Sequence, residues 1–159
     1  MLNKFTKISL LFLRISLGWL MFYAGISKLT NASWSAAGYL THALTFPQIF
    51  GWFASPAILP ITNFLNEWGL TILGISLIFG LCVRLTSFFG ILLMVLYYLP
   101  VLEFPFIQPN SYLVDDHIIY IFVLLIFIST SAGRFYGLDG LWTKSRLAKK
   151  HPKTTKLLA

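Results

Sequence analysis

Residues 8–29 read ISLLFLRISLGWLMFYAGISKL, an apolar run that holds only two charged residues, Arg14 and Lys28. A helix that crosses the hydrocarbon core of a bilayer needs about 20 mostly apolar residues. The apolar part of a cleaved signal peptide is shorter, at about 7–15 residues, and Arg14 would interrupt it. The run therefore predicts a first membrane-spanning helix over residues 8–29.

Three further apolar stretches have the length and composition of membrane spans. They cover residues 60–83, 86–102 and 116–133, and each has few or no charged residues. Pro60 suits the first turn of the second span, because that turn does not use the backbone N–H that proline lacks. Short connections make the second and third spans antiparallel neighbours, and the third and fourth likewise. The sequence predicts an all-α membrane protein, a four-transmembrane-helix bundle.

The composition of the whole chain agrees with this fold class. Of 159 residues, 57% are hydrophobic and only 11% are charged, whereas a soluble domain carries about 25% charged residues. Cys82 is the only cysteine, so one chain builds neither a disulfide nor a cysteine-rich metal site.

The end of the chain is strongly basic. Six of the basic residues lie between Lys144 and Lys156. We therefore predict a four-helix membrane domain over residues 1–142 and a basic cytoplasmic tail over residues 143–159, attracted to anionic lipid and not to nucleic acid.

The charges sort onto two sides of the membrane. If the N-terminus lies in the cytoplasm, eleven of the twelve Lys and Arg residues lie at or toward the cytoplasmic ends of the spans, and Lys28 is the exception. Basic residues are concentrated on the cytoplasmic segments of membrane proteins. The sequence therefore predicts an N-in/C-in topology, with the loop at residues 108–110 outside. Four of the five acidic residues fall on the outer side: Glu67, Glu103, Asp115 and Asp116.

The segment between the first two spans is too interrupted to cross a membrane. Residues 34–44 have the pattern of a short helix with Asn31 or Ser33 as its cap. Residues 46–59 are apolar but are broken by proline and glycine. We expect a short interfacial segment, rich in Trp and Phe, that lies among the headgroups or folds over the mouth of the bundle.

Polar and small residues share one face of the first span. Arg14, Gly18, Gly25 and Lys28 recur at steps of three, four or seven residues, which places them on one side of a helix. The glycines are typical of a seam where two membrane helices approach closely. Lys28 and Glu67 could each reach water at the outer interface. We predict instead that they meet between the first two helices, since a carboxylate in a membrane is costly unless it is paired or protonated.

The start of the fourth span carries the densest polar group of the chain. Residues 115–120 read DDHIIY. Two carboxylates and an imidazole in one turn can bind a metal, relay protons or hold a redox ligand. Acids at a helix N-terminus also cap free N–H groups and oppose the helix dipole, which is the plainer reading of Asp115. A metal would need further ligands, for which Glu67 and His42 are the candidates, and we expect no metal site.

A second polar group is predicted at the inner ends of the spans. Asp139 is the only acidic residue there, and three arginines are its possible partners. We expect structural ion pairs, because a buried charge needs a partner. The residues concerned are Arg14, Arg84, Arg134 and Asp139.

Several stretches, in this order along the chain, resemble the DoxX family of small four-helix membrane proteins. The resemblance covers about residues 8–142. The stretches are Leu13-Arg14, residues 23–29 (YAGISKL), residues 67–69 (EWG), residues 80–85 (GLCVRL), residues 113–120 (LVDDHIIY), and residues 132–134 (AGR) with 137–139 (GLD).

The resemblance implies quinone-linked or redox-defence chemistry at the prokaryotic plasma membrane. The chain would be a quinone-interacting subunit or accessory component of a membrane oxidoreductase. In that case Lys28, Glu67, Asp116, His117 and Tyr120 form an outer pocket for a quinone headgroup. Asp116, His117 and Glu67 would exchange protons with it, because quinone reduction needs nearby donors and acceptors whose pKa burial can tune.

The expected partners are the lipid bilayer, a quinone and a redox partner subunit. No covalently bound cofactor is expected, and a single cysteine provides no dithiol. Electrons would therefore come from another subunit. The alternative is a non-catalytic membrane partner protein or a small-solute or proton transporter, in which the same residues form a structural network or a proton path.

Overall fold

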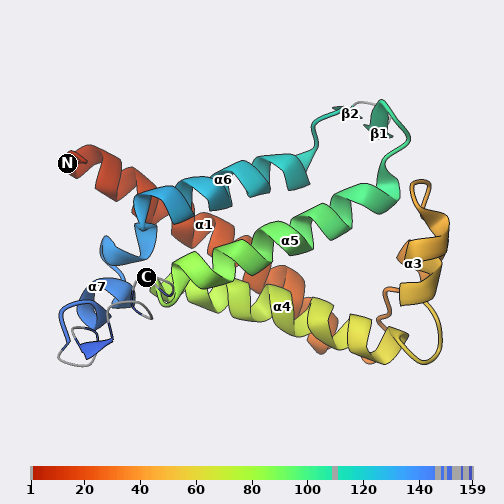
Figure 1. Cartoon of the computed structure of the whole chain (residues 1–159), viewed down its shortest axis with the longest axis horizontal. Coiled ribbons are helices and arrows are strands. Elements are labelled where there is room, and N and C mark those ends of the chain that lie inside the picture. The colour runs from red at the N-terminus through yellow and green to blue at the C-terminus, as the bar shows by residue number, and fades with distance from the viewer. Residues whose placement is uncertain are drawn as a thin grey trace.

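Four longer helices form the body of the molecule and run along its length (Figure 1). The computed structural model describes residues 2–108, 111–145, 148, 150, 151, 155 and 158. The chain begins with α1 and returns through α4, α5 and α6, so that successive long helices run in opposite directions (Figure 1). Their bounds are α1 Lys4–Leu29, α4 Leu59–Phe79, α5 Val83–Val101 and α6 Asp116–Thr130.

Three of these helices, α1, α4 and α5, are long and apolar enough to cross a membrane. The fourth, α6, is apolar but has 15 residues, which span about 22 Å against a hydrocarbon core of about 30 Å. In the part of the chain that the structure describes, three helices therefore qualify as spans by length and composition. The predicted helical membrane fold is confirmed at this level, whereas the fourth span and the N-in/C-in topology stay predictions.

Local capping explains two boundaries that differ from the sequence prediction. α1 begins at Lys4, before the predicted residue 8, because the Asn3 side chain accepts a hydrogen bond from Thr6 N at 2.7 Å. α4 ends at Phe79, before the predicted residue 83. Gly80 there adopts a left-handed conformation, with φ 66°, that ends helices without a Cβ penalty.

The start of α5 depends on a residue from the far end of the chain. Asp139 accepts hydrogen bonds from Cys82 N at 2.7 Å and from Val83 N at 3.1 Å. These are N–H groups that a helix start leaves without intrahelical partners. α5 therefore begins at Val83 and not at the predicted residue 86.

The end of α6 also differs from the predicted end of the fourth span at residue 133. α6 ends at Thr130 and is followed by the 3-10 helix η1 (Ala132–Arg134) and by α7 (Leu138–Trp142).

Glycines set the close packing of α1 against α4. At each of three positions a Cβ would collide with the opposite helix, so the two backbones approach directly. The predicted glycine seam is confirmed. The facing pairs are Gly18 with Leu77, Gly25 with Thr71, and Gly74 with Phe22.

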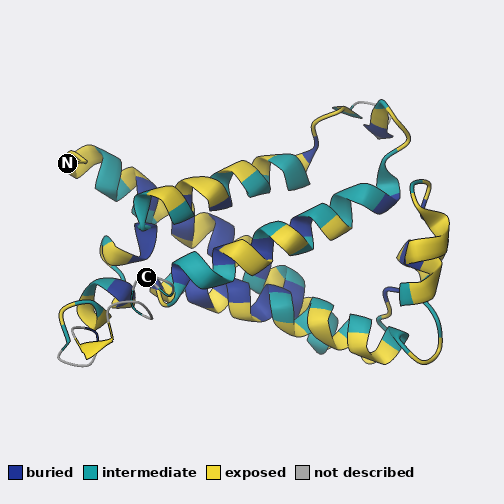
Figure 2. Ribbon diagram, in the orientation of Figure 1, coloured by how far each residue is buried: buried dark blue, intermediate teal, exposed yellow. Residues whose placement is uncertain are grey.

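The buried residues lie where the long helices meet, and exposed residues lie on the outer faces of these helices (Figure 2). Each long helix carries an outward phenylalanine that is more than half exposed: Phe12, Phe64, Phe88 and Phe122. A soluble protein would bury such residues, whereas in a bilayer they contact lipid. The distribution therefore supports the assignment as an integral membrane protein.

Two short helices lie across one end of the molecule, away from the N-terminus and α7 (Figure 1). They are α2 (Ala37–Thr41) and α3 (Pro47–Phe53). α2 is shorter than the helix predicted over residues 34–44, and neither predicted cap holds it. Asn31 instead accepts a hydrogen bond from Ser33 N at 3.1 Å in a local turn.

The connection between α5 and α6 also lies at this end and contains a small hairpin that the sequence did not predict. Strand β1 (Phe106–Gln108) pairs antiparallel with β2 (Ser111–Tyr112). Residues 109 and 110, which belong to the loop predicted to lie outside, are not among the described residues. Most of the predicted tail, residues 143–159, falls outside them as well.

Candidate functional site

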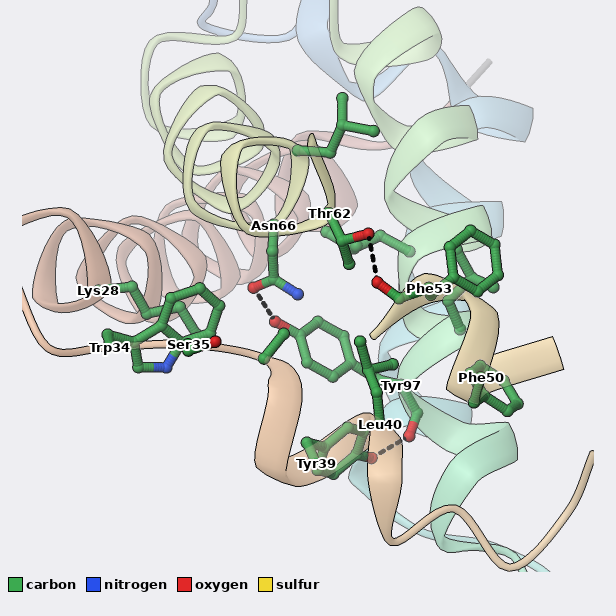
Figure 3. Close-up of a pocket in the computed structure, with 14 residues that line it drawn as sticks. Lys28, Trp34, Ser35, Tyr39, Leu40, Phe50, Phe53, Thr62, Asn66 and Tyr97 are labelled. Carbon is green, nitrogen blue, oxygen red and sulfur yellow. Dashed lines mark hydrogen bonds between the residues drawn. The ribbon is translucent and has the colours of Figure 1, made fainter. Parts of the chain in front are cut away.

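A cavity of about 270 Å³ lies at the end of the molecule that carries α2 and α3 (Figure 3). Its walls come from four helices and from the end of α1. The lining is mostly aromatic and aliphatic, with a few polar side chains. The residues labelled there are Lys28, Trp34, Ser35, Tyr39, Leu40, Phe50, Phe53, Thr62, Asn66 and Tyr97.

The short helices are fixed over this cavity by hydrogen bonds to the long ones. Thr62 of α4 donates to Phe53 O at 3.2 Å, which holds the end of α3. Leu44 N donates to Pro100 O at 2.8 Å, and Thr45 Oγ1 donates to Leu102 O at 2.5 Å. The segment between α2 and α3 is therefore tied to the end of α5, and the predicted interfacial segment lies over the bundle mouth as one wall of the cavity.

Asn66 and Tyr97 form the polar centre of the cavity. Tyr97 Oη donates to Asn66 Oδ1 at 2.5 Å, so α5 and α4 are linked across the site (Figure 3). Tyr39 Oη donates to the backbone oxygen of Tyr97. Burial, and the more distant charge of Asp115, raise the pKa of Tyr39 to about 12, so its hydroxyl keeps its proton. Among the described residues, Asn66 Nδ2 has no partner and remains a donor for a ligand.

Lys28 lies at the rim of the cavity without the partner predicted for it. Its ammonium donates to Ala24 O at 3.0 Å and lies 5.5 Å from the centre of the Trp34 ring. The α1–α4 register places Glu67 at the level of Lys28. Within the described ranges, however, no ion pair joins them. The prediction that Lys28 pairs with Glu67 is therefore wrong. The ammonium of Lys28 instead contacts a carbonyl of its own helix and the face of the Trp34 ring. Glu67 stays half-buried.

The two adjacent carboxylates at the start of α6, those of Asp115 and Asp116, have different roles. Asp115 is 8% exposed, accepts from Ile118 N at 3.2 Å and contacts His117 Nδ1 at 2.6 Å. The predicted cap at Asp115 is confirmed, and the same side chain holds the imidazole. Asp116 is exposed and does not line the cavity.

Tyr97 connects the cavity to this turn. Its ring stacks on the His117 imidazole, with centroids 5.6 Å apart and planes 20° apart. The Tyr120 ring lies edge-on to the His117 imidazole, with ring centroids 6.4 Å apart. One face of the site is therefore a row of three rings, formed by Tyr97, His117 and Tyr120. Tyr97 lies between the cavity and His117.

Of the five residues predicted for the pocket, only Lys28 lines the cavity. The other four, Glu67, Asp116, His117 and Tyr120, lie outside its wall. Sequence reasoning missed Tyr39, Asn66 and Tyr97 as lining residues. An amide and a phenol inside otherwise apolar spans are the signals that could have found the last two.

Comparison with known proteins supports the family resemblance. The DoxX family model matches residues 9–101. The chain belongs to the DoxX family. No curated protein and no solved structure matches it. The matched range runs from residue 9, within α1, to the end of α5 and contains every residue that lines the cavity, whereas the DDHIIY turn and the inner residues 132–139 lie beyond it.

A second polar cluster closes the opposite end of this DoxX protein. Arg14, which is 1% exposed, donates to Ala132 O at 2.8 Å, to Phe135 O at 3.2 Å and to Tyr136 O at 3.3 Å. Asp139 is also 1% exposed. Arg14 and Asp139 attract each other, but both bind mainly backbone groups, and in the described residues they form no direct ion pair.

The charge state of Asp139 reflects two opposing effects. Burial raises the pKa of Asp139, while the N–H groups of Cys82 and Val83 and the charges of Arg14 and Arg134 lower it. Burial, and next the charge of Asp139, also raise the pKa of the Cys82 thiol. This cluster is structural, because its polar atoms serve the ends of helices.

Proposed function

We propose that this DoxX protein is a quinone-interacting subunit or accessory component of a membrane oxidoreductase or redox-defence complex. It would lie in the prokaryotic plasma membrane with four spans and both termini in the cytoplasm. The observation that carries the proposal is the cavity between α2, α3, α4 and α5. It is mostly apolar, about 270 Å³ in volume, and is lined by a few polar groups.

The lining suits a flat, conjugated headgroup with carbonyl oxygens. Trp34, Phe50 and Phe53 offer ring faces and edges for a planar ligand. Asn66 Nδ2 offers a donor to one carbonyl, and the Lys28 ammonium at the rim offers a second. Such sites bind ligands through apolar walls and a few well-placed polar groups.

Proton exchange would take place at the row of rings. Conversion of a quinone to a quinol takes up two electrons and two protons. The electrons would come from a redox partner subunit. His117 with Asp115 lies on the side of Tyr97 that faces away from the cavity, and this pair would exchange protons with water. Asp116 and Glu67, also proposed for proton exchange, would act from outside the cavity wall.

Two neighbouring tyrosines provide the test. We expect the purified protein to bind a short-chain ubiquinone or menaquinone analogue. Difference spectroscopy measures this binding. Tyr97→Phe should weaken binding about fivefold, as expected for one lost hydrogen bond that orients Asn66. Tyr98→Phe is the matched control, because the Tyr98 hydroxyl donates to Leu113 O and does not line the cavity. Equal affinity for wild type, Tyr97→Phe and Asn66→Leu would refute this site.

Glu67 favours a second candidate, a membrane partner protein or a small-solute or proton transporter. Its carboxylate is half-buried within α4 and has no partner among the described residues. Ionisable groups in that position often mark proton paths. Proteoliposomes that show proton or solute flux in wild type, loss of flux in Glu67→Gln, and no quinone binding would favour this function over the first.

A further inference from the structure

Part of the rim of the candidate cavity consists of lipid-facing side chains. Leu65 of α4 and Leu96 of α5 both line the cavity, yet Leu65 is 60% exposed and Leu96 is 38% exposed. A side chain that lines a cavity and is also exposed belongs to its rim. Both helices have the length and composition of membrane spans, so this part of the rim would contact the hydrocarbon of the bilayer and not water.

An apolar stripe continues from this rim along the outer side of α4 and α5. Three residues of each helix recur at steps of three and four, which places them on one face of that helix. The six residues of the α4–α5 stripe are Leu65, Gly69 and Ile72 of α4, with Phe89, Leu93 and Leu96 of α5. Ile72 and Phe89 are exposed. A Cβ at Gly69 would lie 3.6 Å from Leu93 Cδ2, so the two halves of the stripe adjoin there.

Helix packing does not account for the glycine in the middle of the stripe. At Gly25 a Cβ would lie 2.3 Å from Thr71 Oγ1, and at Gly74 it would lie 2.3 Å from Phe22 N, so these glycines are required by the contact of α1 with α4. The 3.6 Å contact at Gly69 is an ordinary distance that leaves room for a side chain. Glycine inside a helix is unfavourable relative to alanine. The space beside Gly69 therefore suits an occupant from outside the chain.

The size of the cavity indicates what this occupant is. Sites that enclose a whole drug-sized ligand measure about 300–1,000 Å³, whereas this cavity measures about 270 Å³. It therefore has room for a headgroup, and a long apolar tail attached to that headgroup must leave it. An exit between Leu65 and Leu96 keeps the tail in apolar surroundings, whereas an exit beside Lys28 and Ser35 would take it past polar groups.

We infer that the cavity binds a membrane-dissolved amphiphile whose tail leaves between Leu65 and Leu96 and lies along the α4–α5 stripe over Gly69. Its headgroup lies beside Asn66. Because the exit faces hydrocarbon, the ligand enters sideways from the bilayer. The inference rests on the proposed function for the identity of the headgroup as a quinone, and adds that the ligand must carry an apolar tail.

Two ligands that share one ring test the inference: the ubiquinone ring without a tail, and decylubiquinone, which adds an alkyl tail. Gly69→Leu fills the middle of the stripe. Difference spectroscopy in detergent should show decylubiquinone binding weakened about fivefold, because the displaced tail loses van der Waals contacts with both helices. Binding of the tail-less ring should stay within about twofold of wild type. Partitioning of the tail into micelles is the same for every variant and cancels in the comparison.

Ser129→Leu is the matched control, because it adds a leucine at an exposed position of α6 that does not line the cavity. It should leave the binding of both ligands unchanged. The melting temperature of Gly69→Leu without ligand should not fall, since leucine is a better helix former than glycine and has room beside Leu93.

The outcomes separate this inference from the proposed function. The inference alone is overturned if wild type binds both ligands and Gly69→Leu binds decylubiquinone as wild type does. It is also overturned if Gly69→Leu loses both ligands equally, or if Ser129→Leu weakens decylubiquinone binding as much. If wild type binds neither ligand, the proposed function is refuted and the inference with it.

Discussion

At the scale of single residues, Asp115 and Asp116 are adjacent in the sequence and differ in their structural roles. Asp115 is buried, caps Ile118 N and holds His117, whereas Asp116 is exposed. Asp115→Ala should therefore lower the free energy of unfolding by about 1–2 kcal/mol, the usual effect of a lost cap. Asp116→Ala should change it by less than about 0.5 kcal/mol. Thermal unfolding in detergent measures both, and equal destabilisation by the two variants would contradict the assignment of the cap.

At the scale of elements, the first turn of α5 is completed by an acid from α7. Asp139 accepts from Cys82 N and Val83 N, which are 57 and 56 residues away along the chain. Asp139→Ala leaves these N–H groups without their acceptor and removes the negative charge that attracts the buried Arg14, so we expect a loss of about 3 kcal/mol. Hydrogen exchange should show faster exchange at residues 82–86 and unchanged exchange at residues 4–7, where Asn3 provides a local cap. Unchanged protection at residues 82–86 would show that the α5 start does not need Asp139.

At the scale of the whole molecule, the described N-terminus and α7 lie at one end, and α3 with the hairpin lies at the other (Figure 1). With the basic residues concentrated at the first end, we predict that this end is cytoplasmic. In a Cys82→Ser background, a cysteine at position 112 should react with an impermeant maleimide in intact cells. A cysteine at position 144 should react only after the membrane is permeabilised. The reverse pattern would invert the topology and place the cavity on the cytoplasmic side.

Much of the helical fold follows from patterns that are local in the sequence. Long apolar runs predict the long helices, because a bilayer accepts only segments that satisfy their own backbone hydrogen bonds. The spacing of Gly18 and Gly25 predicts the seam with α4, and Asp115 is recognisable as a cap from its position before an apolar run. Each of these signals depends on neighbours within one or two helical turns. The sequence alone therefore determined the long helices, the glycine seam and the Asp115 cap.

Tertiary structure decided the parts that join distant segments. Asn66 and Tyr97, 31 residues apart, meet only because α4 and α5 pack at a particular rotation about their axes. That rotation leaves Glu67 out of the cavity, although the two residues are adjacent in α4. Lys28 contacts Trp34 and its own helix because the chain turns back beside it. Periodicity shows which residues share a helix face, but only packing shows what that face contacts.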